Sequence, residues 1–326
     1  MKKIIIITII LLSSWLVKLE AQQLPIFSQY MFNTFLINPA VAGQDGLTSV
    51  NLTAREQWVG LKDAPRTHVL TAQTRLYPDN FITRIAHLKK KEDGGSVSGR
   101  VGLGINVYND KNGLLDKSGF QFTYAYHLPV ELAELSFGLT FSAYQLKMNK
   151  SKMILTDYSD DLYNNSDFTR FIPDFNFGTM YTTKDYYVGL SIAQLTQSSI
   201  QFGNSGASDY YRLYRHFYLL GGYTYPIGSD YTLESSMLIK ASKTARPQFD
   251  ISSKVFIKSQ YWAGLSFRTG SALILLAGVT VDKYSFGYAF DYDLSAIRKS
   301  TFGSHEFMVT IKFGDNPKRF KWLNRF

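Results

Sequence analysis

The stretch Phe120-Gln121-Phe122-Thr123-Tyr124-Ala125-Tyr126-His127-Leu128 alternates large apolar side chains with small or polar ones. Successive side chains of a β-strand point to opposite faces, so the pattern predicts a strand with one apolar face and one polar face. The same alternation returns at 101–107, 135–142, 284–291 and 307–313. We therefore expect an all-β chain.

Working outward from this stretch, the alternation predicts about fourteen strands, each roughly ten residues long, which is the length that a tilted strand needs to cross a bilayer. The predicted strands are 47–57, 67–76, 99–109, 118–128, 134–145, 172–182, 186–193, 213–225, 231–241, 248–258, 261–269, 272–281, 283–291 and 304–313. An even number of strands returns both ends of a barrel to one side of the membrane.

A soluble β-sandwich would alternate in the same way, but two further features favour a transmembrane antiparallel β-barrel. Tyr and Phe, 22 and 24 residues in all, gather near the ends of the apolar faces, as aromatic girdles do. The opposite face is mostly Gly, Ser, Ala and Thr, which suits a narrow or plugged lumen.

The lengths of the predicted connections give an independent argument. Connections after even-numbered strands are short, at 129–133, 183–185, 226–230, 259–260 and 282, whereas 146–171, 194–212 and 292–303 are long and polar. Short periplasmic turns opposite long external loops are typical of outer-membrane barrels. The exception is 77–98, which is long and contains Lys89, Lys90 and Lys91. We expect a bacterial outer-membrane protein with both termini in the periplasm.

The N-terminus has the order of a secretory signal peptide: basic Lys2 and Lys3, an apolar run from Ile4 to Leu12, and Ala21 as a cleavage residue. We divide the chain into a signal peptide (1–21), an N-terminal periplasmic or plug segment (22–46), the outer-membrane barrel (47–313) and a basic periplasmic tail (314–326). The chain contains no cysteine, so disulfides and thiolate metal sites are excluded.

The formal net charge is +9, and the layout places basic side chains in the 77–98 connection and in the tail. A basic periplasmic face would meet a periplasmic partner or an anionic lipid headgroup, although such a charge run is also compatible with plain solvated surface. Nucleic acid is set aside as a partner because the aromatic side chains belong to the lipid-facing pattern.

No set of residues predicts an enzyme. Ser304, His305 and Glu306 are the residue types of a catalytic triad, but alternation places His305 on the opposite face from the other two. No pair of histidines has metal-ligand spacing, and the acidic stretch 157–167 lacks the spacing of a calcium loop. We expect no cofactor and no metal.

Two segments outside the strand pattern stand out. Residues 25–43 are rich in aromatic and amide side chains, which could fill the lumen as a plug or lie beneath the barrel on a partner. Residues 56–67 form the first external turn, where Trp58 is either an aromatic-girdle residue or a recognition residue.

These segments resemble the PorP/SprF family, outer-membrane proteins of the type IX secretion system of Bacteroidetes. The matching pieces are FSQYMFNTFLINPAVAG at 27–43, REQWVGLKDAPRTH at 55–68, QFD at 248–250, FDYDLSAI at 290–297 and GSHEF at 303–307. Lys62-Asp63 departs from the family, which more often has glycine there, and this departure loosens the predicted turn.

The resemblance implies an accessory role in secreting or anchoring large surface adhesins through their C-terminal sorting domains, with a possible part in gliding motility. It also implies contact with periplasmic lipoproteins or peptidoglycan-linked components, and a barrel that is not the main conduit. The candidate partner-binding residues are Gln29, Tyr30, Asn33, Asn38, Pro39, Gly43, Trp58, Gly60, Pro65, Lys89, Lys90, Lys91, Gly303, Ser304, His305 and Glu306.

In a closed barrel the first strand pairs with the last, so the 58–66 turn and Gly303–Glu306 should meet at the outer end of this seam. The alternative function is uptake of hydrophobic solutes, because a fourteen-strand barrel with an N-terminal plug also resembles fatty-acid transporters. An apolar cavity with a lateral opening would favour uptake, and a filled lumen would favour secretion.

Overall fold

The strand pattern of the sequence closes into a barrel in the computed structural model, which describes residues 24–76, 100–149, 169–201, 210–243 and 245–314. Fourteen of the described strands form one closed sheet and two form a separate short hairpin, β8–β9. The barrel strands are β1 (Thr48–Glu56), β2 (Arg66–Leu76), β3 (Val101–Asn112), β4 (Leu115–Val130), β5 (Ala133–Met148), β6 (Thr169–Thr182), β7 (Tyr186–Ala193), β10 (His216–Ile227), β11 (Tyr231–Ser242), β12 (Ala245–Ile257), β13 (Tyr261–Arg268), β14 (Ala272–Val281), β15 (Tyr284–Asp293) and β16 (Ser304–Phe313).

The predicted fourteen-strand barrel is confirmed. Neighbouring strands in the sequence are neighbours in the sheet, except that β7 pairs with β10 because the hairpin of β8 (Ser199–Gln201) and β9 (Tyr210–Arg212) lies between them in the sequence. The seam joins β1 to β16 antiparallel, from Thr48 opposite Phe313 to Glu56 opposite His305. The β8–β9 hairpin was not predicted, since 194–212 was assigned to a loop.

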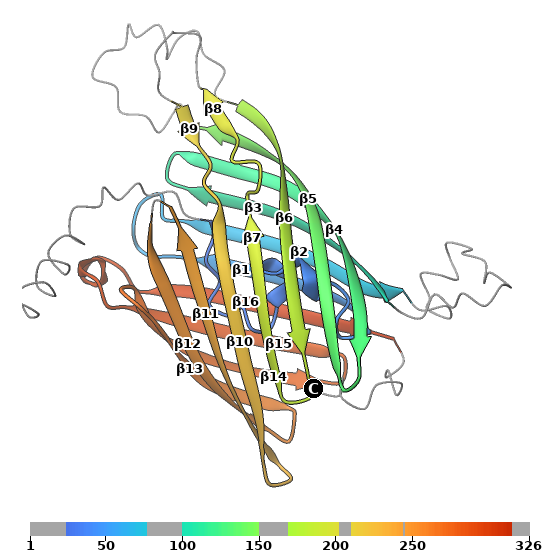
Figure 1. Cartoon of the computed structure of the whole chain (residues 1–326). Coiled ribbons are helices and arrows are strands. Elements are labelled where there is room, and N and C mark those ends of the chain that lie inside the picture. Colours follow the sequence, from blue (N-terminus) through green and yellow to red (C-terminus); the bar gives the residue numbers. More distant parts are fainter. Residues whose placement is uncertain (1–23, 77–99, 150–168, 202–209, 244, 315–326) are drawn as a thin grey trace, which may run out of the picture.

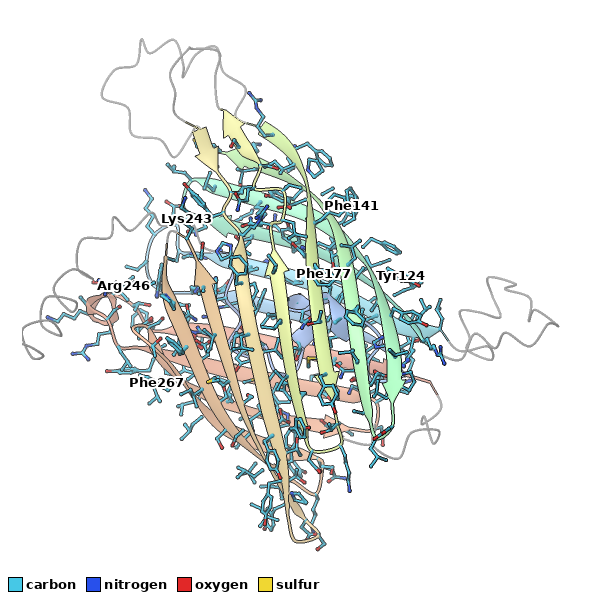
Figure 2. All side chains as sticks on the ribbon, in the orientation of Figure 1. Tyr124, Phe141, Phe177, Lys243, Arg246 and Phe267 are labelled. Carbon is cyan, nitrogen blue, oxygen red and sulfur yellow. The ribbon has the colours of Figure 1, made fainter. Side chains whose placement is uncertain are left out.

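The two faces of the wall are sorted as the alternation predicts. On β4, Phe120, Phe122 and Tyr124 are exposed, whereas Thr123 and His127 are buried in the lumen. Figure 2 shows the side chains of Tyr124, Phe141, Phe177 and Phe267 standing outward from the barrel. An apolar belt of this extent on a closed barrel is the surface that lipid covers. Among the described residues, no helix is both long enough and apolar enough to cross a membrane.

The connections define the two ends of the barrel. At one, here called the turn end, lie the turns 131–132, 183–185, 228–230, 258–260 and 282–283. At the other, the loop end, lie 57–65 and 294–303, the latter containing the short helix η4 (Ala296–Lys299), together with the β8–β9 hairpin (Figure 1). The predicted exception at 77–98 falls outside the described residues.

The segment before β1 lies inside the barrel, where Figure 1 shows it in blue. It contains the short helices η1 (Thr34–Leu36) and η2 (Pro39–Val41). Its first described residue is at the loop end, because the Lys240 Nζ atom near the end of β11 donates to the Leu24 carbonyl at 3.2 Å. Its last residues are at the turn end, where Asp45 and Lys312 form an ion pair at 3.2 Å. The segment therefore runs the length of the lumen.

Candidate functional site

The N-terminal segment, residues 24–46, is a plug packed against one side of the lumen. Tyr30, Phe35 and Val41 belong to a buried apolar cluster with wall residues such as Met180 and Leu220. Of the two alternatives open for this segment, a plug or a layer beneath the barrel, the described residues show the plug.

Glycines of the inward face make room for this plug. An added Cβ at Gly102 would meet the Ala42 carbonyl, and one at Gly138 would meet Pro39. Gly178 and Gly287 face the side-chain oxygens of Asn38 and Gln29 in the same way. A glycine within a strand often marks the close approach of another backbone segment. The small inward side chains read from the sequence thus match a filled lumen.

Near the loop end, buried charges fasten the plug to the seam. This Arg55 cluster consists of Arg55, Asp250, Arg268, Asp291 and Glu306, each no more than 2% exposed. Arg55 lies 2.7 Å from Asp291 and 3.2 Å from Glu306, and Arg268 lies 2.8 Å from Asp250 and 3.3 Å from Asp291. Three carboxylates thus surround two guanidinium groups, which leaves the cluster one negative charge in excess.

The plug supplies hydrogen bonds that compensate this charge. The backbone N–H groups of Ser28 and Gln29 both donate to the Glu306 carboxylate at 2.8 Å. The Ser28 hydroxyl donates to Asp291 at 2.7 Å, and Arg268 donates to the Phe27 carbonyl at 3.3 Å. Buried charges persist only when they are paired and hydrogen-bonded, so plug and cluster stabilise one another.

Near the turn end, a second group of buried charges holds the other end of the plug. This Glu134 cluster consists of Arg75, His127 and Glu134: the Arg75–Glu134 pair is 2.6 Å long and His127 Nδ1 lies 3.2 Å from Glu134. The opposite ring nitrogen, Nε2, is 2.9 Å from the Ala42 carbonyl. A carbonyl only accepts, so Nε2 carries the proton in this contact.

Between the two clusters, amide side chains attach the middle of the plug. Asn33 donates to Asn51 and Thr71 at 3.0 and 3.1 Å. Asn38 accepts from the Ala40 N–H at 3.0 Å, which caps helix η2, and donates to the Thr179 carbonyl at 2.9 Å. These bonds account for the two asparagines of the segment, because their short amide side chains reach both plug and wall.

Outside the lumen, the 57–65 connection is joined to the 294–303 connection. The Val59 N–H donates to the Gly303 carbonyl at 2.9 Å, and the Phe302 N–H donates to the Val59 carbonyl at 2.8 Å. Trp58 donates its indole N–H to Asp293 at 3.2 Å and its backbone N–H to the Ser304 hydroxyl at 3.1 Å. The predicted meeting of these two segments at one end of the seam is confirmed.

Backbone conformation explains several residues of this surface. Gly60 has φ +101, and a Cβ there would reach the Phe302 ring at 3.0 Å; Gly303 has φ +88. Asp63 has φ +56, a conformation that glycine adopts more readily. The departure from glycine at Lys62-Asp63 therefore falls where a non-glycine residue is strained. The backbone N–H of Gln57 donates to the Pro65 carbonyl at 2.9 Å and closes the 57–65 turn.

The candidate partner-binding residues divide into four groups. Gln29, Tyr30, Asn33, Asn38, Pro39, Gly43 and Glu306 are buried in the lumen, where they form or hold the plug; Trp58, Gly60, Pro65, Gly303 and Ser304 lie at the loop end. His305 faces outward as predicted, 2.7 Å from the Tyr288 hydroxyl. Lys89, Lys90 and Lys91 lie outside the described residues.

Sequence reasoning did not identify the buried ion pairs. Four of these residues, Arg55, Asp250, Asp291 and Glu306, were inside quoted motifs, and Glu306 was a candidate partner-binding residue, but none was predicted to form an ion pair. Arg75, Glu134 and Arg268 were not assigned a role. The signal was present, because each of these residues falls on the polar face of its strand. A charge at such a position must find a partner in the lumen.

Comparison with known proteins gives one family. The family model described as "Type IX secretion system membrane protein PorP/SprF" matches residues 19–311. Among curated proteins, none matches the chain significantly.

Solved structures that align with the chain are outer-membrane barrels at low identity. The Ralstonia pickettii toluene transporter TbuX has 9% identity over 86% of this chain and 93% of its own, with a TM-score of 0.49. The Acinetobacter baumannii outer membrane protein Omp33 has 8% identity over 83% of this chain and 100% of its own, with a TM-score of 0.45. These similarities carry no argument about function.

Proposed function

Because the chain belongs to the type IX secretion system membrane protein PorP/SprF family, we propose that it is an accessory outer-membrane component that assists secretion and surface anchoring of large adhesins. Its partners in this proposal are the C-terminal sorting domains of the adhesins and periplasmic lipoproteins or peptidoglycan-linked components of the machinery, with gliding motility as one possible readout.

The observation that carries the accessory role, beyond family membership, is the plug that runs the length of the lumen. The plug is attached through the Arg55 cluster, the Glu134 cluster and the amides of Asn33 and Asn38. Removing one partner of a buried ion pair costs roughly 3–5 kcal/mol, so passage through this barrel would require several such losses together. An attached plug of this kind is more consistent with a protein that binds partners than with a channel through which they pass.

The same observation weighs against uptake of hydrophobic solutes. Such a transporter needs an apolar path, whereas the lumen here holds charged side chains at both ends of the plug. We therefore prefer the secretion role.

We also propose an orientation, with the turn end in the periplasm and the loop end outside. The tail after Gly314 then begins on the periplasmic side, as expected from the sequence. Leu24 and Gly314 lie at opposite ends of the barrel, since a Cβ added at Gly314 would lie 3.5 Å from the Leu47 side chain at the turn end. In this orientation Leu24, the first described residue, lies at the outer mouth, whereas the sequence led us to expect both termini in the periplasm.

The test is a pull-down from outer membranes with an affinity tag after Phe326. Co-purification of adhesin C-terminal domains and periplasmic lipoproteins supports the proposal. Recovery of the barrel with lipid alone, under conditions in which the rest of the machinery is intact, contradicts it.

A further inference from the structure

A cavity near the loop end separates the start of the plug from the barrel wall. It encloses about 120 Å³, and the plug residues Leu24–Phe27 form one side of it. An engineered cavity of about 150 Å³ in another protein holds benzene, so this slightly smaller but partly open space takes part of one six-membered ring, the rest of which lies in its mouth. The cavity is distinct from a larger one, about 600 Å³, at the turn end.

The two sides of this cavity differ in chemistry. The plug side is apolar, with Leu24, Ile26 and Phe27, whereas the wall side contributes amides, hydroxyls and charges. The wall residues that matter most are Asn106, Lys117, Gln121, Tyr144, Asp174 and Asn176. A purely apolar ligand would match only the plug side and would leave the amides and charges of the wall facing it.

Two acceptors in the wall lack donors. Asp174 is 1% exposed and Asn106 is 5% exposed, yet Asp174 Oδ2 and Asn106 Oδ1 have no hydrogen-bond partner among the described residues. An unsatisfied buried acceptor costs about 1–3 kcal/mol, so a ligand that brings donors here gains stabilisation. The other atoms of both side chains are engaged: Asp174 Oδ1 accepts from Thr196, and Asn106 Nδ2 donates to Gln121.

A cation and aromatic rings complete the wall. The Lys117 ammonium lies 3.9 Å from the centroid of the Tyr144 ring and 5.8 Å from that of Tyr108. Two ring faces at a cation position it firmly, so its N–H groups are available at a fixed point of the wall. The wall therefore offers both a donor group and unsatisfied acceptors within one cavity.

We propose that this cavity binds a neutral, hydroxyl-rich ring, such as a hexose or the end residue of a glycan. Each hydroxyl both donates and accepts, so it suits Asp174, Asn106 and Lys117 together. The C–H faces of the ring cover the apolar side formed by Leu24–Phe27. This site is independent of the secretion role.

The experiment uses the purified full-length mature barrel in detergent and equilibrium dialysis against radiolabelled probes. The probes are glucose, galactose, mannose and N-acetylglucosamine, with toluene as the apolar comparison. At least one sugar should bind saturably with Kd on the order of 1 mM, which corresponds to about −4 kcal/mol. Saturable binding of toluene alone, or of no probe, overturns the proposal.

Two variants locate the binding. Lys117→Met and Asn106→Leu keep similar side-chain volume and should each weaken the sugar about tenfold, whereas Thr280→Val, in the 600 Å³ cavity, should not. Heat-dependent gel mobility of each variant verifies that the barrel is folded. Unchanged affinity in both folded cavity variants refutes the site.

Discussion

Glu306 shows at the scale of one residue why the plug and the seam depend on each other. Its carboxylate accepts from two plug N–H groups and from Arg55, and the residue is fully buried. We expect Glu306→Gln to lower the free energy of unfolding by about 1–3 kcal/mol, because the amide –NH2 group cannot accept a hydrogen bond and leaves a buried N–H donor of the plug unpaired. Urea unfolding in micelles, followed by tryptophan fluorescence, measures this change.

The matched control is Glu56→Gln. Glu56 forms the exposed pair with Arg66 at 3.8 Å, and solvent screens such a pair. This variant should unfold as the parent does. If Glu306→Gln and Glu56→Gln have the same free energy of unfolding, the buried Arg55 cluster does not stabilise the barrel more than an exposed ion pair does.

A glycine of the wall offers a second change at residue scale. In Gly102→Ala the new Cβ would overlap the Ala42 carbonyl, so the plug must shift. Since the chain has no cysteine, Val41→Cys gives a single thiol at a position that is 8% exposed. Gly102→Ala should raise the maleimide labelling rate of this thiol at least about tenfold, equivalent to about 1.4 kcal/mol in the closed–open equilibrium.

Gly221→Ala is the control for this prediction. A Cβ at Gly221 would have its nearest neighbour at 3.5 Å, which is ordinary contact, so labelling should stay at the parental rate. Equal labelling rates in the two glycine variants would show that Gly102 does not hold the plug closed.

At the scale of elements, the joined connections 57–65 and 294–303 form the part of the seam that reaches beyond the barrel. Trp58 bonds to Asp293 there, while His305 on β16 faces outward to Tyr288. If this surface receives an adhesin domain, Trp58→Ala combined with His305→Ala should reduce adhesin display several-fold with the barrel still folded. Surface immunolabelling of the adhesin measures display, and a normal level in the double variant rejects this surface as the receptor.

The sequence predicted elements better than it predicted contacts. Strict alternation fixes which side chains face lipid, so β7, β14 and β16 have the predicted bounds, and the other barrel strands differ by a few residues at their ends. The Arg55 cluster joins residues more than 200 positions apart, from β1, β12, β13, β15 and β16. Local pattern carries no information on such pairings, because they depend on strand register and on a plug that passes between them.

At the scale of the whole molecule, the plug ties closure of the barrel to the N-terminal segment. Ser28 and Gln29 bond to β16, the last strand, and Asn33 bonds to β1 and β2, the first two. The seam can therefore close with its charges satisfied only when the plug is already in the lumen. We infer that the plug enters before or during closure, and not through the finished barrel.

Single cysteines at the two ends of the barrel test its proposed orientation. The first cysteine replaces Leu114, in the turn between β3 and β4 at the loop end. The second replaces Leu132, in the turn between β4 and β5 at the turn end, where Leu132 is 83% exposed. With no native cysteine to interfere, a membrane-impermeant maleimide on intact cells should label Leu114→Cys and reach Leu132→Cys only after the outer membrane is opened. Leu24→Cys should label from outside at a rate limited by the plug, because Leu24 is at the loop end. If the labelling pattern is reversed, the proposed orientation is wrong. The loop end, with the joined connections 57–65 and 294–303, then lies in the periplasm.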